Sequence, residues 1–92
     1  MAKITFHVPT MLADCCQDQT RFDLEATKLR AAIESAMTRY PILRRHVFED
    51  TGAQRRHVLI FLNDENIAWL ANPDPDLKDA DKITVVQAIS GG

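Results

Sequence analysis

One amphipathic helix dominates the pattern of this chain and limits how the chain can fold. Apolar side chains recur at three- and four-residue intervals over residues 29–40, and charged or polar side chains occupy the opposite face. Thr27 stands where a helix cap is expected, and Pro41 stops the pattern. A single helix with one apolar face needs an apolar partner surface, which the rest of the chain has to supply.

Alternating segments on both sides of the helix predict strands that supply this surface. Residues 3–8 alternate between apolar and polar side chains until Pro9, and residues 21–25 alternate again. After the helix, we expect strands over residues 55–62 and 83–88. The economical arrangement is a mixed sheet of four to five strands over one main helix, an α+β fold.

The remaining segments are expected to be short connections. Residues 10–19 indicate a loop, 42–47 a short turn of helix, 63–66 a turn, and 72–76 an irregular proline-containing loop. A chain of 92 residues holds one modest core. We therefore expect one domain over residues 1–88 and a flexible tail over 89–92.

Composition excludes several classes of function. The net charge is −2, and the basic residues are spread among acidic ones, which disfavours a nucleic-acid or anionic-membrane binder. There is no apolar run long enough for a signal peptide or a membrane span, so a cytoplasmic protein is expected. The adjacent Cys15 and Cys16 are then expected to be reduced thiols, although a redox role of Cys15 stays open.

Motifs for independent catalysis are not found in the sequence. His7, His46 and His57 lack metal-ligand spacing, and no cysteine pair has the spacing of a zinc site. Only three glycines occur, so there is no glycine-rich phosphate loop. We expect a protein that is not an enzyme and binds no metal or cofactor of its own.

The two last residues, Gly91 and Gly92, are the most distinctive feature outside the predicted core. They follow closely on the last predicted strand, and glycine has no Cβ, so this end can enter a narrow channel. A carboxylate becomes a useful electrophile once it is converted to an acyl phosphate or acyl adenylate. Taken alone, the pair is equally compatible with ordinary fraying at a chain end.

The chain resembles the MoaD/ThiS-like sulfur carriers, the β-grasp relatives of ubiquitin. The resemblance rests on residues 4–10 (ITFHVPT), the helix start at Thr27, the Arg-Tyr-Pro at 39–41, the strand and turn at 58–67, and the end at 81–92. The strand at 58–67 and the Pro-Thr start look most similar to the CysO-type cysteine-biosynthesis carriers. Departures are Gln87 in place of a common proline, Ala80 in place of a common glycine, and Cys15-Cys16 in a loop that often holds glycines.

This resemblance implies a β-grasp fold and a specific chemistry. An adenylyltransferase similar to the ubiquitin activators would use ATP and magnesium to adenylate Gly92. Sulfide, or a persulfide from a sulfurtransferase, would then displace AMP and leave a thiocarboxylate for a biosynthetic enzyme of cysteine or cofactor metabolism. Gly91 and Ser90 would thread into the activating enzyme. A JAMM-type metallopeptidase that exposes the tail is a further partner that the family leaves open.

The docking surface for such partners can be predicted from the strand period. If Val58, Ile60 and Leu62 face the helix, then Leu59 and Phe61 lie on the opposite face of the sheet. Val86 and Ile89 are expected beside them as a partner-docking patch. A slip of one residue would exchange the two faces.

Two other functions remain open at this stage. The same tail would serve a ubiquitin-like protein modifier, in which Gly92 is transferred to target lysines. A structural or adaptor β-grasp domain with an inert tail is the other.

Overall fold

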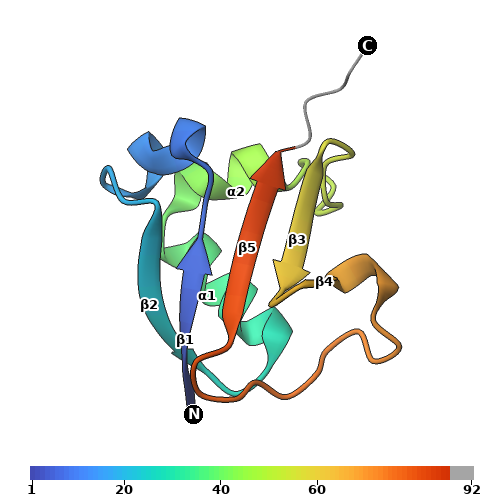
Figure 1. The fold of residues 1–92 in the computed structure, drawn as a ribbon. Coiled ribbons are helices and arrows are strands. Elements are labelled where there is room, and N and C mark those ends of the chain that lie inside the picture. The colour runs from blue at the N-terminus through green and yellow to red at the C-terminus, as the bar shows by residue number, and fades with distance from the viewer. Residues whose placement is uncertain (88–92) are drawn as a thin grey trace.

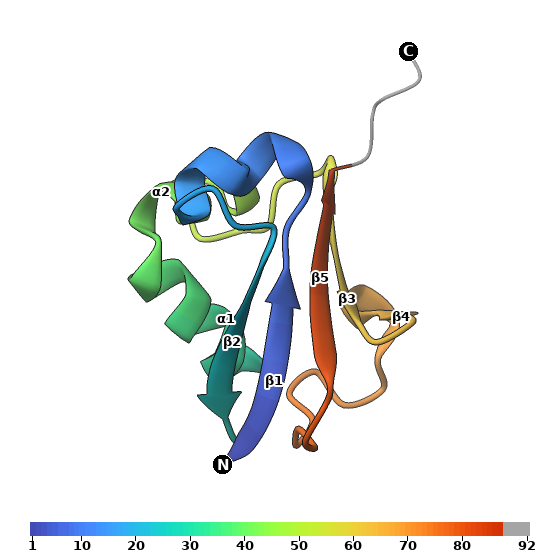
Figure 2. The same cartoon turned by 60° about the vertical axis from the view of Figure 1, so that its left-hand side comes forward.

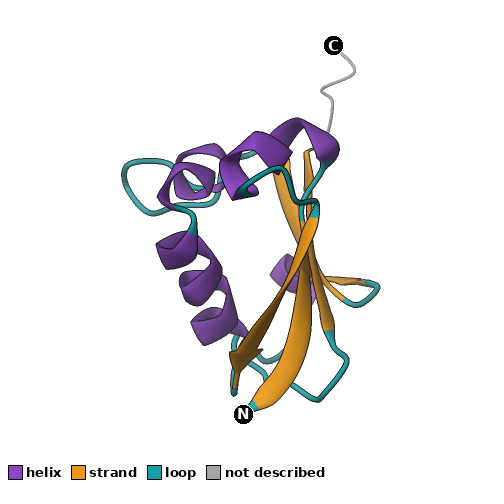
Figure 3. Ribbon diagram, turned by 90° about the vertical axis from the view of Figure 1, so that its left-hand side faces the viewer, coloured by secondary structure: helices purple, strands orange, loops and turns teal. Residues whose placement is uncertain are grey.

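A computed structural model of the chain describes residues 1–87, in which helices cover one face of a five-stranded sheet (Figures 1 and 3). The strands are β1 (Ala2–His7), β2 (Arg21–Ala26), β3 (Val58–Leu62), β4 (Glu65–Asn66) and β5 (Lys82–Gln87). The helices are the 3₁₀ helix η1 (Thr10–Cys16), α1 (Leu29–Arg39), α2 (Pro41–Val47) and the 3₁₀ helix η2 (Ile67–Trp69).

The sheet is mixed, with the order β2-β1-β5-β3-β4. β5 lies between β1, to which it is parallel, and β3, to which it is antiparallel. The last described strand is therefore held on both edges, and the sequence-based prediction of a mixed α+β sheet over a main helix is confirmed. Figure 1 shows that β5 ends beside the start of β3.

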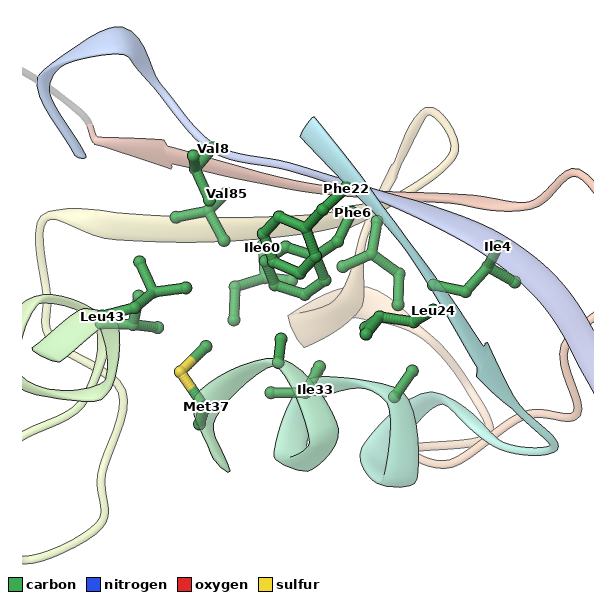
Figure 4. Packing of buried hydrophobic residues seen from close by; sticks show 14 of the residues in the cluster. Ile4, Phe6, Val8, Phe22, Leu24, Ile33, Met37, Leu43, Ile60 and Val85 are labelled. Atoms are coloured by element: carbon green, nitrogen blue, oxygen red, sulfur yellow. The ribbon is translucent and has the colours of Figure 1, made fainter. Parts of the chain in front are cut away.

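The core fills the space between the sheet and α1. The labelled side chains in Figure 4, among them Phe6, Ile60 and Val85 from the sheet and Ile33 and Met37 from α1, point toward one another. Phe6, Ile60 and Met37 are fully buried, which confirms the apolar face predicted for the helix. This layer holds β5 against the helices.

The start of α1 differs from the prediction, because Lys28 and not Thr27 is the N-cap residue, and its side chain does not cap the helix. A loop far along the chain supplies the partners instead. The carboxylate of Asp74 accepts a hydrogen bond from the backbone N–H of Arg30 at 2.9 Å, and the Pro75 carbonyl accepts one from Leu29 at 3.1 Å. Orphan N–H groups of the first turn are thus satisfied from outside the helix.

Three connections also differ from the prediction. The expected loop 10–19 contains η1, because Leu12 and Cys16, four residues apart, are buried in the core. The strand expected over 55–62 begins at Val58, since the N–H of Arg55 donates to the Val47 carbonyl instead of joining the sheet. The turn expected over 63–66 is shorter, and Glu65–Asn66 pair with β3 as β4.

A left-handed turn leads the chain into β5. Ala80 has φ +74°, and its N–H donates to the Lys3 carbonyl at 2.9 Å. A non-glycine residue pays roughly 1–2 kcal/mol for this conformation. Alanine thus adopts the kind of backbone geometry for which the family resemblance predicts glycine.

Candidate functional site at the end of the last strand

The candidate site begins where β5 ends, at Gln87. Gln87 pairs with Val58 of β3, so the last described residue of β5 lies beside the first residue of that strand. The predicted site residues Ser90, Gly91 and Gly92, the docking residue Ile89, and Ala88 of the predicted strand lie outside the described residues.

The face of the sheet opposite the helices carries the other predicted docking residues. Val58 and Ile60 are buried against the helices, so Leu59 and Phe61 point the other way, as the strand period predicts. Leu59 is the register partner of Val86 on β5. The structure therefore places all three side chains on one face, which Figure 1 shows in front of the helices.

These three side chains differ in how much they are exposed. Val86 is 37% exposed, whereas Leu59 and Phe61 are half-buried. We call Leu59, Phe61 and Val86 the apolar patch. It spans β3 and β5, the last described strand before the tail.

The neighbouring part of this face is polar and basic. His7 on β1 is the register partner of Thr84 on β5. Partial burial lowers the pKa of His7 below its usual value, and the charges of Lys82 and Arg21 lower it further. The apolar patch is thus bounded on the β1 side by polar groups.

The environment of the Cys16 thiol is not suited to a redox site. Its side chain is fully buried, and burial raises its pKa to about 11, with a smaller contribution from Cys15. A thiolate is the reactive form of cysteine, so this thiol is inert near neutral pH. Cys15 is half-buried and belongs to the same turn of η1.

We expect thiol titration to show this difference. At pH 7, an aromatic disulfide reagent should modify Cys15 and leave Cys16 unmodified until the protein is unfolded, after which both thiols react. Cys15→Ser should remove the native-state reaction, whereas Cys16→Ala should keep it. Modification of Cys16 in the folded protein at the rate of a free thiol would contradict its buried, protonated state.

A groove of about 880 Å³ lies on the helical side of the molecule, with Ile33, Ile60 and Leu70 among its apolar lining residues. Both acidic and basic side chains also line it, including Glu34 and Arg44, which form an ion pair.

Within residues 1–87, no group of three or more histidine, cysteine, aspartate or glutamate side chains could hold a metal ion. None of the helices in this part of the chain is long and apolar enough to cross a membrane.

Comparison with known proteins adds the decisive observation. The family model described as the ThiS family matches residues 7–92, which is nearly the whole chain and includes the terminal glycines. The chain belongs to the ThiS family. No curated protein sequence matches this ThiS-family chain.

Solved structures agree with this membership. The small archaeal modifier protein 1 (SAMP1) of Methanosarcina acetivorans is 24% identical, with a TM-score of 0.83, 100% of this chain covered and 98% of the other. CysO of Mycobacterium tuberculosis is 23% identical, with a TM-score of 0.80 and coverages of 94% and 99%. A chain of the Amycolatopsis orientalis BexX/CysO complex is 19% identical, with a TM-score of 0.81 and coverages of 97% and 99%. At these identities the likeness establishes the fold, which is the ubiquitin-like β-grasp.

Sequence reasoning placed the apolar patch on the correct face but missed two features of the molecule, one at each end of the sheet. One is the contact of α2 with Arg55, which brings basic side chains near the end of β5. The other is the capping of α1 by Asp74. Both depend on pairs of residues far apart in the sequence, so no local pattern signals them.

Proposed function

We propose that this ThiS-family protein is a sulfur carrier whose C-terminal Gly92 is converted to a thiocarboxylate. The observation that carries the proposal is that the family match extends through Gly91-Gly92 to the last residue. The fold supports it, because β5 is paired on both edges and gives the tail a firm base.

The proposed reaction has two steps. A carboxylate oxygen of Gly92 attacks the α-phosphorus of ATP, and pyrophosphate leaves from a magnesium-dependent active site of the partner. The sulfur of hydrosulfide, or the outer sulfur of a persulfide, then attacks the acyl carbon, the bond from that carbon to the AMP oxygen breaks, and AMP leaves. Attack by hydrosulfide gives the thiocarboxylate directly. Attack by a persulfide gives an acyl disulfide, whose S–S bond is cleaved by a thiol, so that the thiol and the inner sulfur leave as a disulfide and the thiocarboxylate remains as a nucleophilic sulfur donor.

The carrier contributes position and not catalytic groups in this scheme. Gly91 and Gly92 add no side chains that would obstruct a narrow channel, and Ser90 is small. The apolar patch, together with Ile89, would hold the activating enzyme and later the sulfur-accepting enzyme, because exposed apolar side chains on a sheet are natural docking sites. ATP and magnesium belong to the activating partner, an adenylyltransferase similar to the ubiquitin activators, and a JAMM-type metallopeptidase is a third candidate partner.

A second candidate function is a protein modifier. It is favoured by the similarity to SAMP1, whose name describes a modifier protein. In that case the lysine amine of a target, in place of hydrosulfide, attacks the activated acyl carbon. The same activation step serves both functions, so they differ only in the second nucleophile.

Reconstitution tests the proposal. The carrier is incubated with the adenylyltransferase of its own host, ATP, magnesium and sulfide, and the products are separated by mass. We expect AMP release and a carrier heavier by the difference between one sulfur and one oxygen atom. AMP release that depends on added lysine-containing protein, with Gly92 joined to lysine, would select the modifier. A carrier that stays unchanged would contradict both.

The apolar patch gives a separate prediction. Val86→Asp should raise the KM of the adenylyltransferase for the carrier by about tenfold or more, because a charge in the centre of a desolvated contact costs at least about 1.4 kcal/mol. The matched control is Trp69→Asp, since Trp69 is 77% exposed and follows the opposite end of β3. Its KM should stay within about twofold. Equal KM values for Val86→Asp and wild type would remove the patch from the interface.

A further inference from the structure

The near-neutral net charge of the chain conceals two oppositely charged ends. Residues 44–57 contain four arginines, Arg44, Arg45, Arg55 and Arg56, against two acidic residues. Residues 63–81 contain six acidic residues against one lysine. The first segment leads into the start of β3, and the second leads into the start of β5. Because β3 and β5 are antiparallel, the two segments lie at opposite ends of the sheet.

The basic segment lies directly beside the point where β5 ends. The backbone N–H of Arg55 donates to the carbonyl of Val47 at 2.9 Å, and its Nε donates to the carbonyl of Arg45 at 2.8 Å. Two residues further, His57 precedes Val58, which pairs with Gln87. Figures 1 and 2 show the end of α2, the start of β3 and the end of β5 at the same end of the molecule.

Several of these side chains are free to meet a partner. Arg45 and Arg56 are exposed, as are His46 and His57 beside them. The ion pairs within residues 1–87 are Lys28–Asp76 and Arg44–Glu34, so neither Arg45 nor Arg56 is paired with a carboxylate of this part of the chain. We call Arg45, His46, Arg56 and His57 the basic rim.

The length of the tail decides what the basic rim can touch. Five residues follow Gln87. An extended chain spans at most about 3.3–3.6 Å per residue, so Gly92 lies no further than roughly 18 Å from Gln87. An enzyme that takes Gly92 into its active site must therefore approach this end of the sheet. When the tail is extended into that site, the rim stays at the channel mouth, remote from the nucleotide.

We propose that the basic rim binds acidic side chains around the channel mouth of the enzyme that activates Gly92. The inference rests on the proposed function and adds the chemistry of the partner surface. Complementary charge accelerates encounter and suppresses wrong orientations. The acidic end at residues 63–81 is repelled by the same partner surface, so the carrier approaches with its tail first.

The test is a charge reversal with a control of equal charge. The double variant Arg45→Glu/Arg56→Glu is compared with Arg30→Glu/Lys78→Glu, in which two exposed basic residues outside the rim are reversed. The readout is AMP release by the host adenylyltransferase, measured over a range of carrier concentrations at low salt and at high salt. Melting temperatures of both variants are measured alongside to establish that they are folded.

We expect the rim variant to raise the KM for the carrier at least about tenfold at low salt with little change in kcat, and the difference to shrink at high salt. The control should stay within about twofold of wild type. Equal KM values for the rim variant and wild type, with normal activity of wild type, would overturn the inference and leave the carrier function intact. No AMP release from wild type would overturn the proposed function and the inference with it.

Discussion

Deletion of Gly92 should abolish activation of the carrier without changing its fold. The deletion moves the terminal carboxylate back by one residue, roughly 3.5 Å along the chain. Displacement of a reacting group by about 1 Å can cost about a hundredfold in rate, so we expect AMP release to fall by at least about that factor. The measurement is adenylate formation with the host adenylyltransferase, followed by mass analysis for thiocarboxylate.

The deleted protein provides its own control. Its melting temperature should match that of wild type, because the described core lies within residues 2–85. It should also inhibit the activation of wild-type carrier competitively, since the apolar patch and the basic rim are retained. Full adenylation of the deleted protein would contradict the assignment of Gly92 as the residue that is activated.

Of the substitutions considered, Phe6→Ala should cause the largest loss in the free energy of unfolding. Phe6 is fully buried on β1, and its ring stacks on Phe22 with the centroids 5.3 Å apart. Removal of a buried phenylalanine costs about 3–5 kcal/mol through lost burial and the cavity that remains. This loss is a large part of the roughly 5–15 kcal/mol by which a folded domain is stable. In a domain of this size, it corresponds to a fall of more than about 12 °C in melting temperature.

Trp69→Ala is the matched control for this prediction. It also removes an aromatic side chain, but Trp69 is 77% exposed, and a change of less than about 0.5 kcal/mol in unfolding free energy is expected. Urea denaturation of both variants gives the two free energies. A Phe6→Ala protein as stable as wild type would contradict the packing shown in Figure 4.

The parts of the fold that were predictable from sequence are those set by local period. The apolar stripe of α1 has a helical repeat, and the alternation around Val58 and Ile60 assigned Leu59 and Phe61 to the opposite face of the sheet. Both patterns arise because α1 and β3 pack in the same core, so the side of each element that faces the core must be apolar. The prediction of the apolar patch required only that the register be correct.

The features that were not predictable depend on residues far apart in the sequence. Thr27 was the expected cap of α1, but its carbonyl accepts a hydrogen bond from Leu77, and Asp74 bonds to the helix start instead. The basic rim likewise arises from the bond between Arg55 and Arg45, which joins two segments whose charges look dispersed along the chain. Such contacts are decided by how the loops close over the core.

Intact-mass measurement of the protein isolated from its own host tests the carrier function most directly. We expect a species heavier than the unmodified chain by the difference between sulfur and oxygen, with fragmentation placing the change at Gly92. Isopeptide adducts at Gly92 would assign the protein to the modifiers instead. Only the unmodified carboxylate, in cells and after supply of ATP, sulfide and host extract, would contradict both the carrier and the modifier.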